Sequence, residues 1–253
     1  MIRTSPQHSR DHSSPTIPGD YQQRALLHGH PVQRRWHAAK LELIQALLGP
    51  SPEGPILDAG CGSGVVSAAL AAGGARVVGV DANPKAIAFA QRTFARVNLR
   101  FVEASLFDFV ETGFTTIVCL ECIEHFPQRE ARALLRHLRQ RAAPGGRLFL
   151  TTPNYHSAWP AIEAALDLMH LTPRLKGEQH LSRFDPNRLA RLLEGADWDL
   201  LELGSFNGLA PFLAPLSAAW AEHMEAAILS NPRKRVRTRR NLLYAWCRAG
   251  GDR

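Results

Sequence analysis

Short apolar runs alternate with amphipathic stretches along most of this chain. Between the runs, apolar side chains recur every three or four residues, the spacing of a helix that buries one face. The runs predict strands at residues 55–59, 75–81, 99–103, 115–120, 147–152, 198–205 and 241–247. A repeated strand–helix order predicts an α/β fold with a doubly wound, mostly parallel seven-stranded sheet, its last strand antiparallel.

The helical periodicity also sets the expected domain organisation. Helices are predicted at residues 33–48, from residue 65, and at residues 83–97, 128–143, 158–171, 185–195 and 210–229. Residues 1–20 are rich in Ser, Pro, His and Arg, and we expect a disordered tail there. Residues 21–253 are then one domain, with the insert 156–180 as a helical lid.

A glycine-rich turn follows the first predicted strand. Residues 60–64 read Gly-Cys-Gly-Ser-Gly, and a small-residue helix opens at Val65. Glycines allow a tight turn and let a ligand lie against bare main chain, towards which the helix start directs unpaired N–H groups. Asp81 ends the next strand, 21 residues after Gly60, where a carboxylate can accept hydrogen bonds from both ribose hydroxyls. The unit therefore predicts nucleotide binding.

The glycine spacing and one carboxylate bear on which nucleotide is bound. Dinucleotide-binding turns read Gly-x-Gly-x-x-Gly, whereas here the third glycine comes one residue earlier. Asp58 would repel a pyrophosphate but suits the ammonium group of S-adenosylmethionine. The stretch 58–64 resembles the first motif of class I S-adenosylmethionine-dependent methyltransferases, Asp-x-Gly-x-Gly-x-Gly. The alternatives are a dinucleotide-binding oxidoreductase and a chance glycine turn in another α/β protein.

That resemblance implies a set of cofactor contacts. In the motif and after the second strand these are Asp58, Gly60, Cys61, Gly62, Gly64, Asp81 and Ala82. Adenine contacts are expected from Ser105, which stands where the family often has Asp, and from the backbone of Leu106. Glu121 follows the fourth strand at the methyl group, and Arg34 or Arg35 of the first helix can offer a cation to the cofactor carboxylate.

Several later motifs resemble the ubiquinone-biosynthesis O-methyltransferase group. They are Glu-x-x-Glu-His at 121–125, Pro-Gly-Gly at 144–146, Thr-Pro-Asn at 152–154, and the spaced set His180, Phe184 and Leu189. In that group the insert covers a phenolic, lipid-like acceptor and can meet a membrane surface. The resemblance implies methyl transfer to a hydroxyl of a small molecule that is phenolic, quinone-like or lipid-linked.

A hydroxyl acceptor must lose its proton, and histidine is the natural base near neutral pH. His125 and His180 are the candidates, with Glu121 beside them; either histidine can instead be structural. Some members of the group hold a divalent cation at Glu121, Glu124 and His125, which would ease deprotonation of a bound phenol. These three side chains can equally cap a helix or pair with arginines.

Charge adds one further feature. The net charge of +7 is concentrated in residues 233–240, which hold six cations. Such a run is a solvated turn, a contact for anionic lipid or, less favoured, one for nucleic acid. A nucleic-acid methyltransferase using this run and a non-catalytic cofactor-binding module are therefore competing functions.

No apolar run of 18 residues and no secretory signal is apparent, so we expect a cytoplasmic protein, with peripheral contact to the inner membrane face as an option.

The four cysteines do not form a second metal or disulfide pattern. Cys119-x-x-Cys122 has a metal-like spacing, but no second pair accompanies it. Both lie where an apolar strand should end, and we expect them to be small core residues.

Overall fold

A computed structural model describes residues 18–50, 52, 54–168, 175 and 179–251. The strands are β1 (Pro55–Ala59), β2 (Arg76–Asp81), β3 (Leu99–Glu103), β4 (Phe114–Leu120), β5 (Ala142–Pro153), β6 (Trp198–Phe206) and β7 (Leu242–Ala249). They form one sheet in the order β3-β2-β1-β4-β5-β7-β6. The pairs from β3 through β5 are parallel, and β7 is antiparallel to both of its neighbours. The predicted mostly parallel, seven-stranded fold is confirmed.

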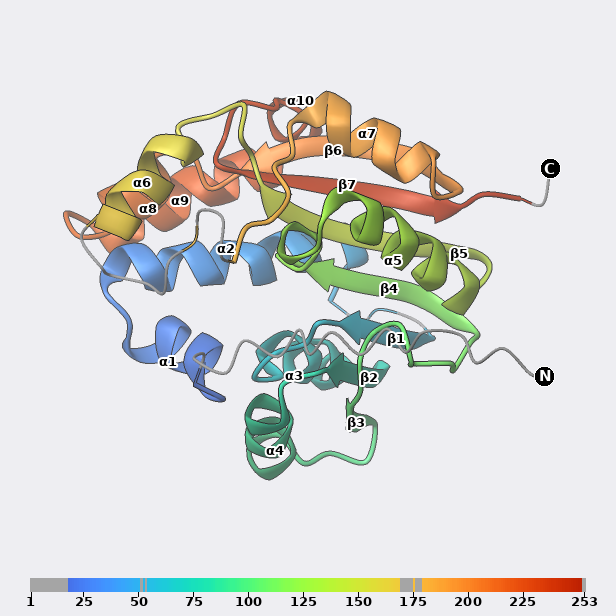
Figure 1. The fold of residues 1–253 in the computed structure, drawn as a ribbon. Helices are drawn as coiled ribbons and strands as arrows, with labels where there is room; N and C mark the ends of the chain where they lie inside the picture. Colours follow the sequence, from blue (N-terminus) through green and yellow to red (C-terminus); the bar gives the residue numbers. More distant parts are fainter. Residues whose placement is uncertain (1–17, 51, 53, 169–174, 176–178, 252–253) are drawn as a thin grey trace, which may run out of the picture.

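Helices cover both faces of this sheet (Figure 1). They are α1 (Tyr21–His28), α2 (Pro31–Leu48), α3 (Val65–Ala72), α4 (Pro84–Thr93), α5 (Gln128–Arg141), α6 (Trp159–Leu168), α7 (Pro186–Glu194), α8 (Ala210–Leu213), α9 (Ala218–Leu229) and α10 (Pro232–Arg235). A short 3-10 helix, η1 (Ile123–His125), follows β4.

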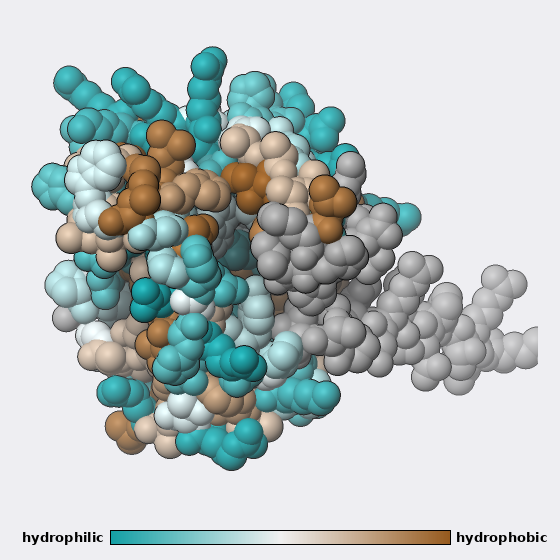
Figure 2. Space-filling model, turned by 90° about the vertical axis from the view of Figure 1, so that its left-hand side faces the viewer, coloured by the Kyte–Doolittle hydropathy of each residue, from teal (hydrophilic) through white to brown (hydrophobic). Residues whose placement is uncertain are grey.

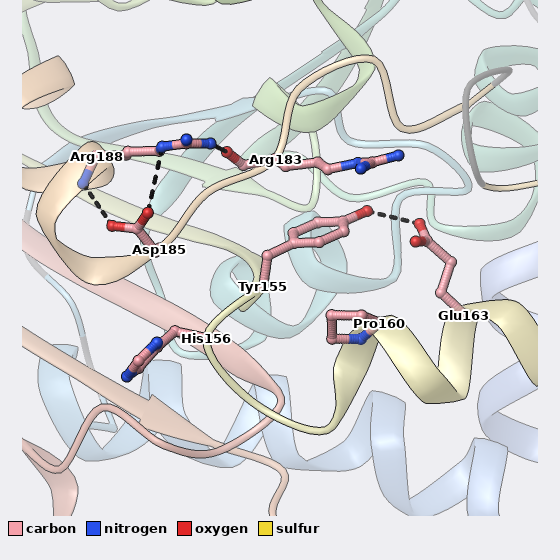
Figure 3. A pocket seen from close by; sticks show the side chains of 7 residues that line it. All are labelled: Tyr155, His156, Pro160, Glu163, Arg183, Asp185 and Arg188. Atoms are coloured by element: carbon pink, nitrogen blue, oxygen red, sulfur yellow. Dashed lines mark hydrogen bonds and ion pairs between the residues drawn. The ribbon is translucent and has the colours of Figure 1, made fainter.

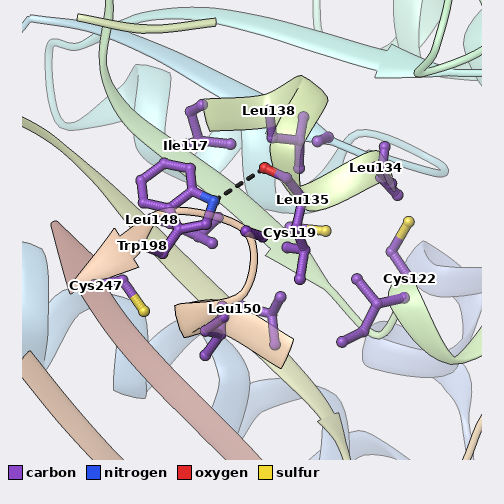
Figure 4. Packing of buried hydrophobic residues seen from close by; sticks show 14 of the residues in the cluster. Ile117, Cys119, Cys122, Leu134, Leu135, Leu138, Leu148, Leu150, Trp198 and Cys247 are labelled. Atoms are coloured by element: carbon purple, nitrogen blue, oxygen red, sulfur yellow. Dashed lines mark hydrogen bonds between the residues drawn. The ribbon is translucent and has the colours of Figure 1, made fainter. Parts of the chain in front are cut away.

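Neighbouring strand residues send their side chains to opposite faces, which creates two cores. Leu57, Ile117 and Leu148 pack with α5 and α7, while Ile56 and Val118 pack with α2, α3 and α4. In the first core the buried Trp198 donates its indole N–H to the Leu135 carbonyl at 3.0 Å (Figure 4). The apolar character of both strand faces explains why the strands read as nearly continuous hydrophobic runs.

All four cysteines are free and buried, and Cys119 and Cys122 belong to the first core, as the sequence predicted. Among the described residues, no helix has the length and hydropathy needed to span a membrane.

Several predicted boundaries were wrong. The helix expected at 83–97 ends at Thr93. The strand expected at 147–152 begins at Ala142, because Ala142 pairs with Phe114 ahead of a register shift that the Pro-Gly-Gly segment spans. The helix expected at 210–229 is two helices, since Pro215 interrupts it and Ser217 caps α9 by accepting from the Trp220 N–H. The predicted disordered tail and the end of the 158–171 helix fall largely outside the described residues.

Among the described residues, α1, η1 and the short α10 were not predicted. Tyr21–His28 forms α1, which packs on α2 ahead of the sheet. In Figure 1, α1, α6, α8 and α9 gather on the left, at the edge where β4 ends. Ligands of open α/β sheets bind at the carboxyl ends of parallel strands, so these helices surround the expected site.

Candidate functional site

The glycine turn between β1 and α3 has the backbone shape that only glycine adopts easily. Gly60, Gly62 and Gly64 have φ angles of 77°, 50° and 79°. The Gly60 N–H donates to the Val80 carbonyl at 2.8 Å, which ties the turn to β2. A side chain at Gly64 would place its Cβ 2.7 Å from the Phe101 ring. The turn is therefore a bare main-chain cradle held at the sheet edge.

Asp81 lies across this cradle. Its carboxylate accepts hydrogen bonds from the Gly62 N–H and the Asn83 N–H, both at 2.8 Å. The side chain is partly exposed, and the neighbouring Ala82 is exposed. The two backbone donors orient the carboxylate and leave it further lone pairs for ribose hydroxyls.

Asp58 lies beneath the turn rather than at its surface. It is 2% exposed and accepts from the Ser67 hydroxyl at 2.6 Å. Burial raises the pKa of Asp58 to about 7, against the opposing effect of the Ser67 hydrogen bond, and the Asp81 charge raises it further. Cys61 in the turn is also buried, and burial raises the pKa of its thiol. A cationic ligand group near Asp58 would favour its ionised form.

Helix α1 contacts the turn through Gln22. The Gln22 side-chain oxygen accepts from the Ser63 N–H at 3.2 Å and from the Ser63 hydroxyl at 3.3 Å. The sequence analysis missed this contact. The only signal was the change from a Pro- and Ser-rich tail to Tyr21-Gln22-Gln23.

Lys40 of α2 supplies a buried cation at the end of β4. Its ammonium group lies 2.7 Å from the Glu121 carboxylate. Arg34 and Arg35 are the cations that the sequence predicts for the cofactor carboxylate, which is a separate contact. Arg34 is exposed on α2, and Arg35 is buried and pairs with Glu42. Helical spacing explains the difference, because Lys40 shares the buried stripe of α2 with Leu43.

The surroundings of Glu121 favour its charged form. Burial opposes ionisation, but the Lys40 charge outweighs it and lowers the pKa of Glu121. Burial and the Lys40 charge lower the pKa of His37 to about 3, so its ring is neutral at physiological pH. Glu121 also has a positive φ of 46°, a backbone conformation that non-glycine residues adopt mainly at special sites.

The predicted adenine loop follows β3. Ser105 accepts from the Phe107 N–H at 3.3 Å, and the Leu106 side chain is buried in the first core. The Ala104 N–H donates to the Asp81 carbonyl at 3.1 Å. The structure thus brings this loop beside Asp81.

A buried histidine–carboxylate pair joins α6 to the loop before α7. The Nδ1 atom of His180 lies 2.7 Å from the Glu163 carboxylate, and the two residues are 7% and 2% exposed. The Tyr155 hydroxyl donates to the same Glu163 oxygen at 2.6 Å (Figure 3). Burial and this acidic neighbour raise the pKa of Tyr155, so the phenol keeps its proton.

Two cavities flank this pair. The cavity in Figure 3 has a volume of 380 Å³, and Glu163 and Tyr155 line it together with Arg183, whose guanidinium lies over the Tyr155 ring. The second cavity has a volume of 460 Å³ and is lined by His180. Both volumes are in the range of small-molecule sites.

Aromatic rings continue from His180 towards α2. The rings of His180 and Trp159 are 6.0 Å apart, and those of Trp159 and Trp36 are 5.3 Å apart. On the other side, the ring of His125 lies 5.7 Å from that of His180. His125 is exposed, and its Nδ1 lies 2.9 Å from the Gln179 carbonyl oxygen.

Glu124 fastens the His180 loop to the end of β4. Its carbonyl accepts from the Leu181 and Ser182 N–H groups at 2.8 and 3.0 Å. Its buried carboxyl accepts from the Thr152 hydroxyl at 3.0 Å, and burial raises the pKa of Glu124 to about 7.

The Glu-x-x-Glu-His motif does not fit a resident metal. Glu121 binds Lys40, Glu124 binds Thr152 and His125 binds Gln179. In the part of the chain that the structure describes, no three His, Cys, Asp or Glu side chains converge on a point where a metal ion could be held.

Comparison with known proteins gives consistent matches. Residues 29–203 match a family described as "Methyltransferase domain". A ubiquinone biosynthesis O-methyltransferase of Xanthomonas oryzae pv. oryzae (strain PXO99A) is 31% identical over 189 residues, covering 72% of this chain and 74% of that protein.

Solved structures share the fold. Magnesium protoporphyrin IX methyltransferase (ChlM) from Synechocystis PCC 6803 with bound SAH has a TM-score of 0.60 and 18% identity, covering 90% of this chain and 92% of that chain. The N-methyltransferase NodS from Bradyrhizobium japonicum WM9, in complex with S-adenosyl-l-homocysteine, has a TM-score of 0.57 and 18% identity, covering 91% of this chain and 97% of that chain. The glycine cradle, the Asp81 carboxylate and the matched family together show that this chain belongs to the S-adenosylmethionine-dependent methyltransferases.

Proposed function

We propose that the protein transfers a methyl group from S-adenosylmethionine to a hydroxyl of a small molecule that is phenolic, quinone-like or lipid-linked. The observation that carries this proposal is the buried pair of His180 and Glu163, 2.7 Å apart. A hydroxyl acceptor needs a base, and a histidine held by a carboxylate is the side-chain arrangement suited to that task.

The tautomer of His180 follows from its contact with Glu163. An Nδ1–H that donates to the carboxylate leaves Nε2 with a free lone pair, ready to accept the acceptor's proton. The Glu163 carboxylate then stabilises the imidazolium that forms. Tyr155 fixes Glu163 by donating to it, so two side chains, Glu163 and Tyr155, hold the base in place.

The remaining residues align and enclose the reactants. Bound S-adenosylmethionine supplies a methyl group already activated by a positive sulfonium. Asp81 and the glycine cradle hold the cofactor at the sheet edge, with Asp58 beneath the turn. Exclusion of water and a fixed approach of the hydroxyl to the methyl group then supply much of the rate enhancement.

The aromatic row suits a flat acceptor. Trp36 and Trp159 come from α2 and from α6, the described part of the insert, and Trp159 is 7% exposed. Tryptophan rings stack on phenolic or quinone-like rings in offset or edge-to-face arrangements. We propose that α6 closes over the acceptor, bringing Trp159 and Glu163 with it.

The experiment is methyl transfer from S-adenosylmethionine labelled in its methyl group into a cell extract, followed by phase separation and mild base treatment. We expect label in the organic phase, stable to base as an aryl methyl ether is, and lost with H180A. H125A is the matched control, since His125 is a neighbouring histidine with an exposed side chain. Label in the aqueous small-molecule fraction would contradict the lipid-linked acceptor, and label in nucleic acid would contradict the whole proposal.

A further inference from the structure

The cavity that His180 lines has a cationic wall. Its volume is 460 Å³, and its lining includes Arg183 and Arg188 but no Asp or Glu. The same two arginines also line the 380 Å³ cavity of Figure 3 and are shared by both spaces. A cleft whose charged wall residues all have one sign concentrates ligands of the opposite sign, so this cavity favours an anionic group.

The two arginines differ in how far their charge is already used. The Nε atom of Arg188 lies 3.3 Å from the Asp185 carboxylate, so an acid neutralises this cation. Among the described residues, Arg183 has no carboxylate partner, and its guanidinium carbon lies 5.6 Å from the centre of the Tyr155 ring. Stacking on the ring orients the planar guanidinium and leaves its N–H groups for a ligand.

The backbone on either side of Arg183 is fastened to the site. The Ser182 N–H donates to the Glu124 carbonyl at 3.0 Å, and the Phe184 carbonyl accepts from the Tyr155 N–H at 2.8 Å. The Phe184 side chain is buried in the first core. The segment that carries Arg183 is therefore in place before any ligand binds, which lowers the entropic cost of binding.

Helix α5 begins at the same cavity. Pro127 and Gln128 line it, and no side chain caps the start of α5 at Pro127. The unpaired N–H groups of a helix start carry a partial positive charge. The start of α5 therefore adds to the positive field of the two arginines.

The side of the cavity that α7 forms faces water. In Figure 2, hydrophilic side chains stand along the upper edge of the molecule, where Figure 1 places α7 and α10. The side chains of Arg183 and Arg188 are exposed. An ionic ligand group at this position would keep part of its hydration, which lowers the cost of binding it.

We propose that Arg183 binds a carboxylate of the acceptor, so that the acceptor is a phenol carrying an acid group. The inference rests on the proposed function, because it takes His180 as the base for the acceptor hydroxyl. Both side chains line one cavity, so a single small molecule can meet both. A planar guanidinium donates two parallel N–H bonds to the two oxygens of a carboxylate. One unpaired guanidinium also balances the single charge of a carboxylate, whereas a phosphate monoester carries nearly two.

The test is calorimetric binding of 3- and 4-hydroxybenzoate to the full chain saturated with S-adenosylhomocysteine. The corresponding hydroxybenzamides are neutral analogues of the same shape. We expect at least one acid to bind about 10-fold more tightly than its amide, the lower end for hydrogen bonds to a charged group, because Arg183 is exposed to water. Added salt should narrow the difference.

R183Q should bind acid and amide with about equal affinity. The matched control is D185N/R188Q, which removes the other cation of the cavity together with its acid partner and keeps an Asn to cap α7. This control should retain the preference for the acid, and thermal melting should confirm that both variants fold.

Three results would overturn the proposal. They are equal affinity of acid and amide in the wild type, binding of neither acid, and an unchanged preference in R183Q. Tighter binding of the hydroxyphenyl phosphates than of both acids would also overturn it, and would assign the cavity to a phosphate group.

A kinetic assay separates this inference from the proposed function. With the better-bound acid as acceptor, R183Q should raise KM with little change in kcat, and H180A should lower kcat. A merely structural Arg183 would raise KM for the amide equally. Preferential binding of the acid without methyl transfer, or with transfer unchanged in H180A, would contradict the proposed function and leave the carboxylate site standing. Transfer to a neutral phenol that H180A abolishes, without preference for an acid, would do the reverse.

Discussion

Lys40 and Glu121 form an ion pair of 2.7 Å between residues 81 positions apart in the chain. The pair fastens α2 to the end of β4, where the methyl group of the cofactor is expected. The Lys40 side chain is 9% exposed and that of Glu121 is 25% exposed, so water screens the pair only partly. The contact also places the Lys40 cation of α2 at the end of β4.

Replacing Lys40 by Ala should therefore cost both stability and cofactor binding. Removing one partner leaves the Glu121 charge uncompensated, which we expect to destabilise the protein by about 2 to 3 kcal/mol in urea unfolding. R34A is the matched control, because Arg34 is exposed on the same helix. A greater loss of cofactor affinity in R34A than in K40A would show that Arg34, and not Lys40, is the cation that supports cofactor binding.

The role of His180 as base predicts a specific kinetic pattern. H180A should lower kcat by about 10² to 10⁴ with little change in KM for S-adenosylmethionine, as expected for loss of a general base. E163Q should lower kcat less than H180A does, because the imidazolium that forms loses its anionic partner. A merely structural Glu163 would leave kcat of the folded variant unchanged, and H125A should behave as the wild type.

Asp81 should determine cofactor affinity. D81N keeps the size of the side chain but removes the charge that the two backbone N–H groups and the ribose hydroxyls share. We expect S-adenosylhomocysteine to bind about 10- to 100-fold more weakly in calorimetry. E103Q is the control, since Glu103 pairs with Asp81 in the sheet register and is exposed. Equal affinities of D81N and the wild type would contradict the assigned ribose contact.

Substitutions at two glycines should distinguish the cost of backbone strain from the cost of a steric clash. Gly64 and Gly74 both have positive φ angles, 79° and 96°, but only Gly64 would press a Cβ onto Phe101, at 2.7 Å. G74A should cost about 1 kcal/mol from backbone strain alone. G64A should cost about 2 to 4 kcal/mol, because overpacking adds to the strain. Equal melting temperatures for the two variants would show that Phe101 moves aside without cost.

The buried acid Asp58 predicts a pH dependence. Its folded pKa of about 7 lies above the unfolded value of about 4, so the folded protein retains a proton that the unfolded chain releases. Stability of the cofactor-free protein is then greatest below about pH 4 for this group and is lost as the pH rises to 7. The melting temperature of the wild type should fall relative to that of D58N between pH 5 and 8.

Cofactor binding should respond in the opposite direction. The ammonium group of S-adenosylmethionine favours the ionised form of Asp58, so affinity should rise as the pH passes 7, and D58N should lack this rise. A constant difference in melting temperature between wild type and D58N over this pH range would show that Asp58 is not buried and protonated in solution.

The sequence by itself determined the sheet and the cofactor cradle. Strands such as Pro55–Ala59 are local apolar runs. The turn at Gly60–Gly64 requires glycine because of its positive φ angles, whatever the rest of the fold. Such features depend on backbone conformation and on neighbours close in sequence. They can therefore be predicted from the local sequence without knowledge of the tertiary structure.

Only the tertiary structure decided which side chains meet at the site. Lys40 rather than Arg34 reaches Glu121 because the rotation of α2 is set by its packing on the sheet. Glu163 reads as one polar position in an apolar helix, and it becomes the partner of His180 when α6 folds over the end of the sheet. Likewise Gln22 covers the glycine turn through a contact spanning 41 positions. These pairings are set by the packing of elements that are distant in the sequence. Local periodicity and propensity carry no information about that packing.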